Sequence, residues 1–212
     1  MAQASREPEA VTGQVPGHLP PEVQTFVQCL LDQKMTRLEC RGCPLRTKPM
    51  VVLDLLNCAG FGPVDVYFMA LNPGREEVVQ WRPLVGPAGG EFHALRNAYI
   101  PTASAVLTNL FLCHTANQAE VPDVASVASR CRGLTRQIAS RFTPRIWIPL
   151  GSPAAHAFGI TGPITQACGK VVHKKGATIL PLVHPSSLFH RRNHFLPLLE
   201  QGFQTLQELL AA

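Results

Sequence analysis

Four cysteines in this chain have the residue type and the spacing of a metal site. Cys40 and Cys43 form a C-x-x-C motif in a loop-like stretch, and Cys113 and Cys131 follow far downstream with 17 residues between them. A C-x-x-C pair fits zinc, a redox pair or two ligands of an iron–sulfur cluster. The second pair would complete a four-thiolate site. If Cys113 and Cys131 are instead ordinary buried thiols, no such site forms.

Polar motifs at the ends of apolar strands are the second candidate for chemistry. The motif NPG at 72–74 ends a strand that starts at residue 64, and Asn109 interrupts a strand that starts at residue 105. The motifs LGSPAA at 150–155 and HPSS at 184–187 follow two more strands, which start at residues 145 and 178. We expect a ligand to meet these residues, because open α/β sheets bind ligands beyond the carboxyl ends of their strands.

Helical patterns lie between these strands. Apolar residues recur at helical spacing over residues 23–31 and roughly over 88–98, 123–141, 152–158 and 193–210. The alternation of strands and helices predicts an α/β protein with three α/β/α layers around a central, mostly parallel four-stranded sheet. We expect a single domain at residues 21–212, preceded by a disordered lead-in at residues 1–20 with scattered prolines and early charges.

The composition favours an anionic partner and argues against a membrane. The chain carries 19 Lys and Arg against 14 Asp and Glu, a net charge of +5, which suits a nucleic-acid partner. No apolar run approaches the roughly 20 residues of a spanning helix, and the N-terminus lacks the apolar core of a signal peptide. We therefore expect a cytoplasmic monomer whose cysteines do not form disulfides.

Taken in order, these motifs resemble the uracil-DNA glycosylase superfamily, most closely its family-four iron–sulfur branch. That branch has a GEAPG strand end, an acidic pair and then G-R-P-F-V-G-x-A-G leading into a helix. The run ALNPGREEVVQWRPLVGPAGGEF at 70–92 aligns with this pattern without a gap. The branch's TN before a cluster cysteine matches Thr108 and Asn109 ahead of Cys113, and its HPS matches 184–186. The resemblance covers nearly the whole chain after the lead-in.

The resemblance implies a monofunctional DNA glycosylase. Such an enzyme rotates an altered pyrimidine out of DNA and hydrolyses its N-glycosidic bond, which leaves an abasic site. The resemblance also implies a [4Fe-4S] cluster in a structural role, with zinc as the less favoured alternative. Its ligands would be Cys40, Cys43, Cys113 and Cys131.

Three polar residues take catalytic and base-reading roles by this resemblance. His184 would hydrogen-bond a base carbonyl as negative charge gathers on the departing base, and Asn109 would read the base edge. Leu71 stands at the family's acidic catalytic position. Asn72, however, matches the G-x-N-P-G motif of the mismatch-specific and single-strand-selective branches, in which the Asn orients the attacking water. We therefore assign the positioning of water to Asn72.

The expected base pocket departs from the family. Leu84 stands where the family stacks a Phe on uracil, and losing a flat ring removes stacking worth about 1–3 kcal/mol. Trp81 could restore that stack, and Gly74 would let the base approach the backbone. We then expect a pocket tuned for a bulky 5-substituted pyrimidine instead of plain uracil. Glu76 and Glu77 remain candidate substitutes for the missing carboxylate.

Further residues are expected to contact the DNA itself. Gly86 and Gly89 would let phosphates approach the start of a helix. Leu188 would be the wedge that fills the space left by the flipped base. Contacts with the DNA backbone are expected from Ser186, Arg191 and Arg192.

Several alternatives stay open from the sequence. A glycosylase of this kind removes either uracil or a hypermodified base, such as a glycosylated hydroxymethylcytosine of phage DNA, which would make the protein a defence enzyme. Because Leu71 replaces the acidic residue, a non-catalytic DNA or abasic-site binding protein is a second hypothesis. A third is a zinc or iron–sulfur structural protein that binds no DNA and shows no salt-dependent DNA affinity.

Overall fold

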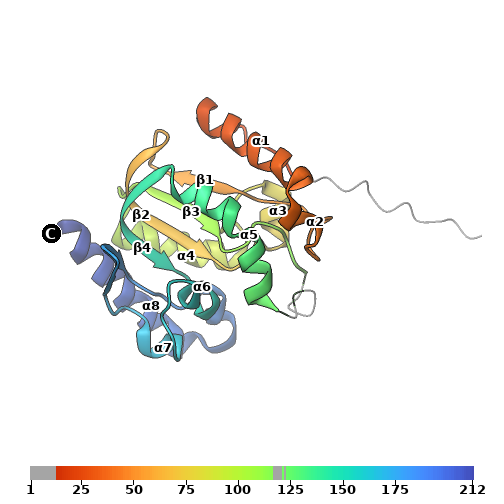
Figure 1. The fold of residues 1–212 in the computed structure, drawn as a ribbon. Helices are drawn as coiled ribbons and strands as arrows, with labels where there is room; N and C mark the ends of the chain where they lie inside the picture. The colour runs from red at the N-terminus through yellow and green to blue at the C-terminus, as the bar shows by residue number, and fades with distance from the viewer. Residues whose placement is uncertain (1–12, 117–120, 122) are drawn as a thin grey trace, which may run out of the picture.

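The computed structural model describes residues 13–116, 121 and 123–212. These residues build a six-stranded sheet in the order β1-β3-β2-β4-β6-β5 (Figure 1). The inner strands β3, β2, β4 and β6 are mutually parallel, and the edge strands β1 and β5 are antiparallel to their neighbours. The strands are β1 (Leu53–Leu56), β2 (Gly62–Ala70), β3 (Ala105–Asn109), β4 (Phe142–Pro149), β5 (Val172–Lys174) and β6 (Ala177–Ile179).

The four inner strands are the four predicted from the sequence, so the α/β class is confirmed and the strand count was too low by two. Both additional strands lie at the sheet edges, and they are only four and three residues long. Segments of that length carry no periodicity that identifies a strand. Their pairing is set by the neighbouring strand, which only the tertiary structure supplies.

Helices cover both faces of the sheet and give the three predicted layers. Helices α4 (Pro87–Tyr99) and α8 (Leu188–Ala211) pack on one face, and α1 (Pro21–Thr36) and α5 (Val124–Ala139) on the other. Successive side chains of β2 point into two different cores. Phe68 and Ala70 face α4 and α8, whereas Tyr67 and Met69 face α1 and α5.

The five predicted helices correspond to α1, α4, α5, α6 (Ser152–Ala157) and α8. Three further helices of four to six residues were not predicted, namely α2 (Leu38–Arg41), α3 (Arg75–Gln80) and α7 (Ile164–Ala167). They are too short to show an apolar stripe. Helix α8 begins five residues earlier than predicted and is kinked at Arg191, where φ is −148° and ψ is 67°.

The predicted disordered lead-in is wrong for its last part. Residues 1–12 lie outside the described part of the chain, but residues 13–20 pack against the domain. Leu19 is 3% exposed, and His18 Nε2 lies 2.6 Å from Oδ1 of the buried Asp54. A buried leucine and a buried ion-pair partner fix this segment in place. Among the described helices, none has the length and apolarity to cross a bilayer.

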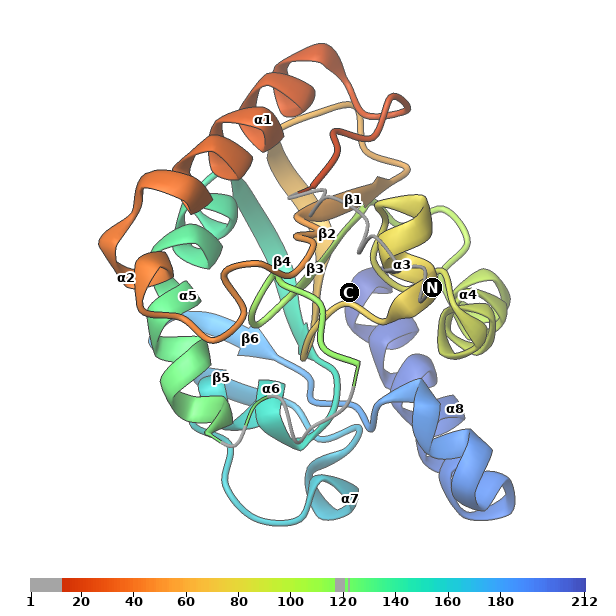
Figure 2. The same cartoon turned by 90° about the vertical axis from the view of Figure 1, so that its right-hand side faces the viewer.

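Strand register brings the polar motifs to one edge of the sheet. Ala70, the last residue of β2, lies opposite Asn109, the last residue of β3. A bridge between Leu150 and Leu182 carries the chain from β4 and β6 to the same edge. Figure 2 shows α3, α4 and the start of α8 around the end of β2. The prediction that these motifs converge on the carboxyl ends of the strands is therefore confirmed.

Candidate active site

A cavity of about 170 Å³ lies at the carboxyl end of β2. About 10–15 Å³ is enough for one water, so this space admits a group much larger than a solvent molecule. It brings together six of the residues predicted for catalysis, base binding or DNA binding. The lining consists of Ala70, Asn72, Gly74, Glu76, Glu77, Leu84, Gly86, Pro87, Ala88, Gly89 and His184.

The hydrogen bonds of His184 define its tautomer. The backbone N–H of Ser186 donates to Nδ1 of His184 over 3.2 Å, and the Ser186 hydroxyl lies 2.8 Å from the same nitrogen. Nδ1 is therefore an acceptor, and the ring proton sits on Nε2. Burial lowers the pKa of His184 to about 4. The imidazole is thus neutral near pH 7 and presents one N–H donor.

Gly151 allows His184 to reach the cavity. Its φ of +88° is strained for any side-chain-bearing residue, and a Cβ placed on it would lie 3.3 Å from Cβ of His184. The N–H of Gly151 donates to the carbonyl of Leu182 over 2.8 Å. This bond ties the loop after β4 to the segment that leads from β6 to His184.

The hydrogen bonds of Asn72 use its amide nitrogen and leave its amide oxygen available to accept a hydrogen bond. Its Nδ2 donates to the carbonyl of Pro73 over 3.0 Å and to Oγ1 of Thr115 over 3.1 Å. Both amide hydrogens are therefore engaged, which leaves Oδ1 available to accept a hydrogen bond. Nδ1 of His114 also lies 2.9 Å from the Pro73 carbonyl, so the segment after β3 fixes the NPG loop.

Asn109 lies beside the cavity, although it is not among the lining residues. It is 1% exposed, and its register partner Ala70 lines the cavity. Its Nδ2 is buried and has no hydrogen-bond partner among the residues that the structure describes. Leaving a buried amide donor unpaired costs about 1–3 kcal/mol. An acceptor atom on a bound ligand would remove that cost.

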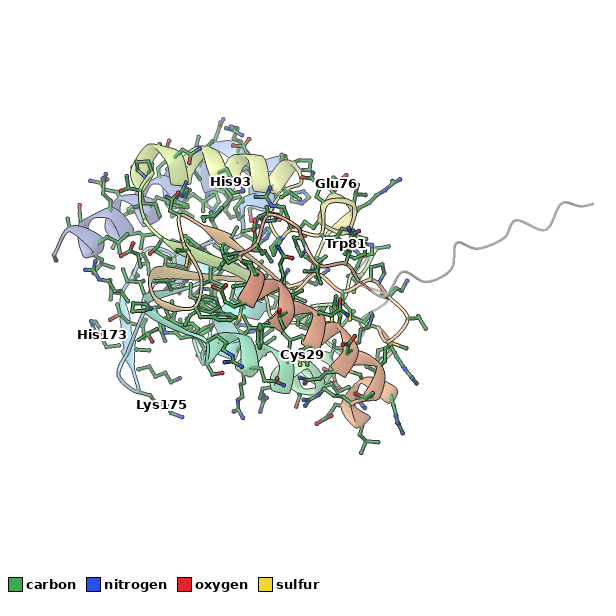
Figure 3. The ribbon with its side chains drawn as sticks, turned by 90° about the horizontal axis from the view of Figure 1, so that it is seen from above. Cys29, Glu76, Trp81, His93, His173 and Lys175 are labelled. Atoms are coloured by element: carbon green, nitrogen blue, oxygen red, sulfur yellow. The ribbon has the colours of Figure 1, made fainter. Side chains whose placement is uncertain are left out.

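The two adjacent glutamates have different environments. Glu77 accepts hydrogen bonds from the backbone N–H groups of Gly74 and Leu84, and burial raises its pKa. Its carboxylate joins the NPG loop to the opposite wall of the cavity. Glu76 is exposed and lines the cavity, near Trp81, the residue that follows α3 (Figure 3). Of the two candidate carboxylates, Glu76 is the one without a backbone hydrogen bond in the described residues.

The wall formed by residues 81–84 is strained and anchored. Trp81 and Leu84 both have φ of +55°, which is unusual for residues other than glycine. Nε of Arg82 donates to the buried Asp54 over 2.9 Å and holds this loop against β1. Leu84 is 2% exposed and lines the cavity, whereas Trp81 is not among the lining residues. The suggested stacking of a base on Trp81 is therefore not supported by this arrangement.

The start of α4 forms the opposite side of the cavity. A Cβ on Gly89 would lie 2.0 Å from the carbonyl oxygen of Leu84, so only glycine fits. Gly86, the N-cap of α4, has no side-chain cap. The first N–H groups of a helix have no partner within the helix and favour anions. The Gly74 N–H, by contrast, is already taken by Glu77 and cannot bind a base or phosphate.

Of the three polar residues expected to contact DNA, two already bind other residues of the protein and one is exposed. Ser186 is engaged with His184, and Arg191 is exposed at the kink of α8. Arg192 donates to both carboxylate oxygens of Glu91 on α4, over 2.6 and 3.2 Å. Its guanidinium therefore braces α8 against α4, and it would have to leave Glu91 to bind a phosphate through both nitrogens.

The prediction of Leu188 as a wedge is wrong. Leu188 is 3% exposed and belongs to the core between α8 and the sheet. The next residue, Phe189, is 55% exposed. A side chain that intercalates must start outside the core, so Phe189 is the apolar residue in position to do so.

The four predicted ligand cysteines line one cavity. Cys40 lies on α2, Cys43 directly after it, Cys113 past the end of β3 and Cys131 on α5. Burial raises the pKa of Cys113 to about 11 and that of Cys131 to about 12, and neighbouring thiolates contribute to both shifts. These thiols would thus need a bound cation to ionise near pH 7.

The donor set of this cavity is four cysteine thiols. Within residues 13–116, 121 and 123–212, no three His, Cys, Asp or Glu side chains form a group that could hold a metal ion. Four thiolates are nevertheless the ligand type of both structural zinc sites and four-iron clusters. By residue type, the donor set therefore fits either occupant.

Several residues that shape the site were not predicted. Asp54, His114 and Thr115 act through contacts with residues distant in sequence, and nothing local marks them. Glu77 was considered only as a catalytic carboxylate, although its position three residues after Gly74 is a helix-capping pattern. Arg82 lies within the aligned run at 70–92, but the alignment assigns it no role of its own.

The comparison with protein families finds one matching superfamily model, which covers the region of this cavity. The family model described as the Uracil DNA glycosylase superfamily matches residues 59–207. The match contains the whole cavity lining together with Cys113 and Cys131, while Cys40 and Cys43 precede it. No curated protein matches the chain.

Proposed function

This chain belongs to the Uracil DNA glycosylase superfamily, and from that premise we propose that it is a monofunctional glycosylase for altered pyrimidines in DNA. Members of the superfamily are DNA glycosylases that act on DNA. The observation that carries the proposal is the shared cavity of Asn72 and His184 at the end of β2. A nucleotide must leave the duplex to place its base in such a cavity.

In the proposed reaction, water attacks C1′ of the flipped nucleotide. The C1′–N bond breaks and its electron pair leaves with the base. Oδ1 of Asn72, the free acceptor of that side chain, orients the water. The water loses its proton to solvent after the attack. Asn72 positions the attacking water and does not act as a base, because a neutral amide does not take the proton of the water.

His184 stabilises the departing base in this mechanism. Its Nε2–H donates to a base carbonyl on which negative charge accumulates. A neutral imidazole suits this role. Because burial lowers the pKa of His184 to about 4, the ring keeps a single proton, on Nε2, near pH 7. Asn109 supplies the unpaired amide N–H that reads an acceptor on the base edge. The uncapped N-terminus of α4 receives a phosphate oxygen or a base oxygen.

The proposed substrates are uracil and bulky 5-modified cytosines. Leu84 offers an aliphatic wall where a flat ring would stack on uracil, and the exposed Glu76 also lines the cavity. An aliphatic wall contacts a substituted base without requiring a parallel ring. A glycosylated hydroxymethylcytosine of phage DNA belongs to this substrate class, and its removal would make the protein a defence enzyme.

We also propose a [4Fe-4S] cluster on Cys40, Cys43, Cys113 and Cys131, with zinc as the less favoured occupant. The cluster would crosslink α2, the end of β3 and α5. The segment after β3 carries His114 and Thr115, which hold the NPG loop. A bound cluster would thereby stabilise the active-site loop without taking part in the chemistry.

The test is product analysis on several DNAs. Purified protein is incubated with single- and double-stranded uracil oligonucleotides and with phage DNA that carries modified cytosines, and released bases are identified by mass spectrometry. We expect a free base and an abasic site from at least one DNA, and none from an Asn72→Ala/His184→Ala double variant. Efficient release of plain uracil would exclude a strict preference for hypermodified bases.

A non-catalytic DNA or abasic-site binder is the second candidate function. Leu71 favours it, because this residue packs into the core beside β2 and no carboxylate enters the cavity from the family's acidic position. This candidate predicts DNA or abasic-site affinity that falls with salt, with no base released from any DNA. Release of any base by the wild type, lost in the double variant, would eliminate it.

A further inference from the structure

A fully buried lysine lies in the wall of the four-cysteine cavity. Lys34, on the last turn of α1, is 1% exposed and lines the cavity with all four cysteines. Lysine is almost never fully buried unless its charge is compensated. The proposed glycosylase chemistry does not use this residue, which lies on the opposite face of the sheet from the cavity of His184.

The position of Lys34 places its charge among the thiols. Its Nζ donates to the backbone carbonyl of Lys48, in the segment between Cys43 and β1. The cavity that Lys34 lines brings together Cys40 on α2, Cys113 past β3 and Cys131 on α5. One ammonium thus borders thiols from separate ligand segments.

Two arginines also line this cavity and are more open to solvent. Arg46 is half-buried and Arg130, on α5, is exposed. The Arg130 guanidinium lies over Gly42 between Cys40 and Cys43, where a Cβ would be 2.9 Å from Nη1. Solvent screens exposed charges. Among the cations described around the cavity, Lys34 is therefore the one whose field is screened least.

Charge balance explains why a buried cation belongs here. Four thiolates carry four negative charges, and a [4Fe-4S] core or a zinc ion supplies two positive ones, so the filled site keeps two negative charges. Burying uncompensated charge costs several kcal/mol. A positive group fixed in the same wall reduces this cost, and it does so for either occupant.

We propose that Lys34 is the buried counter-charge that stabilises the anionic four-thiolate centre. The inference rests on the proposed cofactor and not on which base the enzyme removes. Lys34 acts here through the thiolates and does not ligate the metal.

The test compares Lys34 variants with a nearby surface control. Lys34→Gln removes the charge and keeps a donor, and Lys34→Arg keeps the charge. Arg41→Gln removes a charge from the exposed last residue of α2, which is not among the residues that line the cavity. Iron, sulfide and zinc per chain are measured, followed by the rate of metal loss to a chelator from visible absorbance.

We expect Lys34→Gln to weaken metal retention by about 10–100-fold, as for other residues that support metal ligands. Arg41→Gln should behave as the wild type, and Lys34→Arg should restore part of the loss. Equal retention in Lys34→Gln and wild type would overturn the proposal. A wild type that contains neither iron nor zinc would overturn the cofactor together with it, while base release remains a separate measurement.

A second measurement separates charge from packing. Thermal unfolding is followed for wild type and Lys34→Gln, each with metal bound and after metal removal. We expect Lys34→Gln to lose more stability with metal bound than after metal removal, because the thiolates on which the counter-charge acts form when metal binds. The same loss of stability in both forms would show a purely structural lysine and refute the proposal.

Discussion

Ser186 fixes the tautomer of His184 by donating to Nδ1 from both its backbone N–H and its hydroxyl, at 3.2 and 2.8 Å. The single remaining ring proton, on Nε2, is therefore available to the cavity. This relationship arises within one turn of the HPS motif. It converts a histidine that could donate or accept into a defined donor.

The first prediction concerns these two residues. His184→Ala should lower the rate of base release by about 10²–10³-fold, as expected when a donor to a developing anion is lost. Ser186→Ala keeps the backbone donor and should cost roughly tenfold or less. Single-turnover rates on a cleaved substrate check both values. A Ser186→Ala loss as large as that of His184→Ala would mean that Ser186 has its own role.

The lowered pKa of His184 gives a second prediction, for pH. Burial moves this pKa from 6.5 to about 4, so the folded imidazole stays neutral from pH 8 down to about 5. Titration of His184 should therefore cause no fall in rate across that range. Because the unfolded chain takes up the proton first, the contribution of His184 to stability is lost as pH falls from about 6.5 towards 4. An acidic rate limb near pH 6.5 that disappears in His184→Asn would contradict this.

The third prediction tests the water-positioning role of Asn72. Asn72→Ala should reduce the rate by about 10²-fold, since misplacing a reactant by about 1 Å costs that much. Thr115→Val removes one acceptor of the Asn72 amide and should cost less. Both variants should retain substrate affinity, measured with DNA under conditions without turnover. Full activity in Asn72→Ala would show that another group positions the water.

The fourth prediction uses two neighbouring glycines at the start of α4. Gly89→Ala places a Cβ 2.0 Å from the Leu84 carbonyl oxygen, while a Cβ on Gly90 meets nothing within 4 Å. We expect Gly89→Ala to destabilise the fold by about 1–3 kcal/mol and to disrupt the cavity. Gly90→Ala should stabilise the helix by up to about 1 kcal/mol. Chemical unfolding distinguishes them, and similar effects from both would refute the proposed close contact.

The fifth prediction separates Leu188 from Phe189. Leu188→Ala should lose about 2–5 kcal/mol of stability, because the side chain is buried in the core. Phe189→Ala should change stability by no more than about 0.5 kcal/mol. If Phe189 fills the space of the flipped base, its loss should slow base release from duplex DNA roughly tenfold and from single-stranded DNA much less. Equal effects on both DNAs would exclude a wedge.

Local sequence patterns were sufficient for the inner architecture. Apolar runs and the residues that end them located the four parallel strands, and helical periodicity located α1, α4, α5, α6 and α8. Because parallel strands all end at one edge of a sheet, the motifs around Asn72, Asn109 and His184 could be expected to converge without knowledge of strand order. The edge strands and the short helices lacked any such periodic signal.

The tertiary structure decided what each neighbouring residue does within those motifs. Glu76 and Glu77 are neighbours of the same residue type. Of the two, Glu77 is the one that accepts hydrogen bonds from two backbone N–H groups in the described residues. At the start of α8, Leu188 is buried in the core, whereas the next residue, Phe189, is exposed. Asn72 is positioned by Thr115, which lies 43 residues away. Periodicity reports only which face of a segment is apolar, whereas these roles depend on contacts between segments distant in the chain.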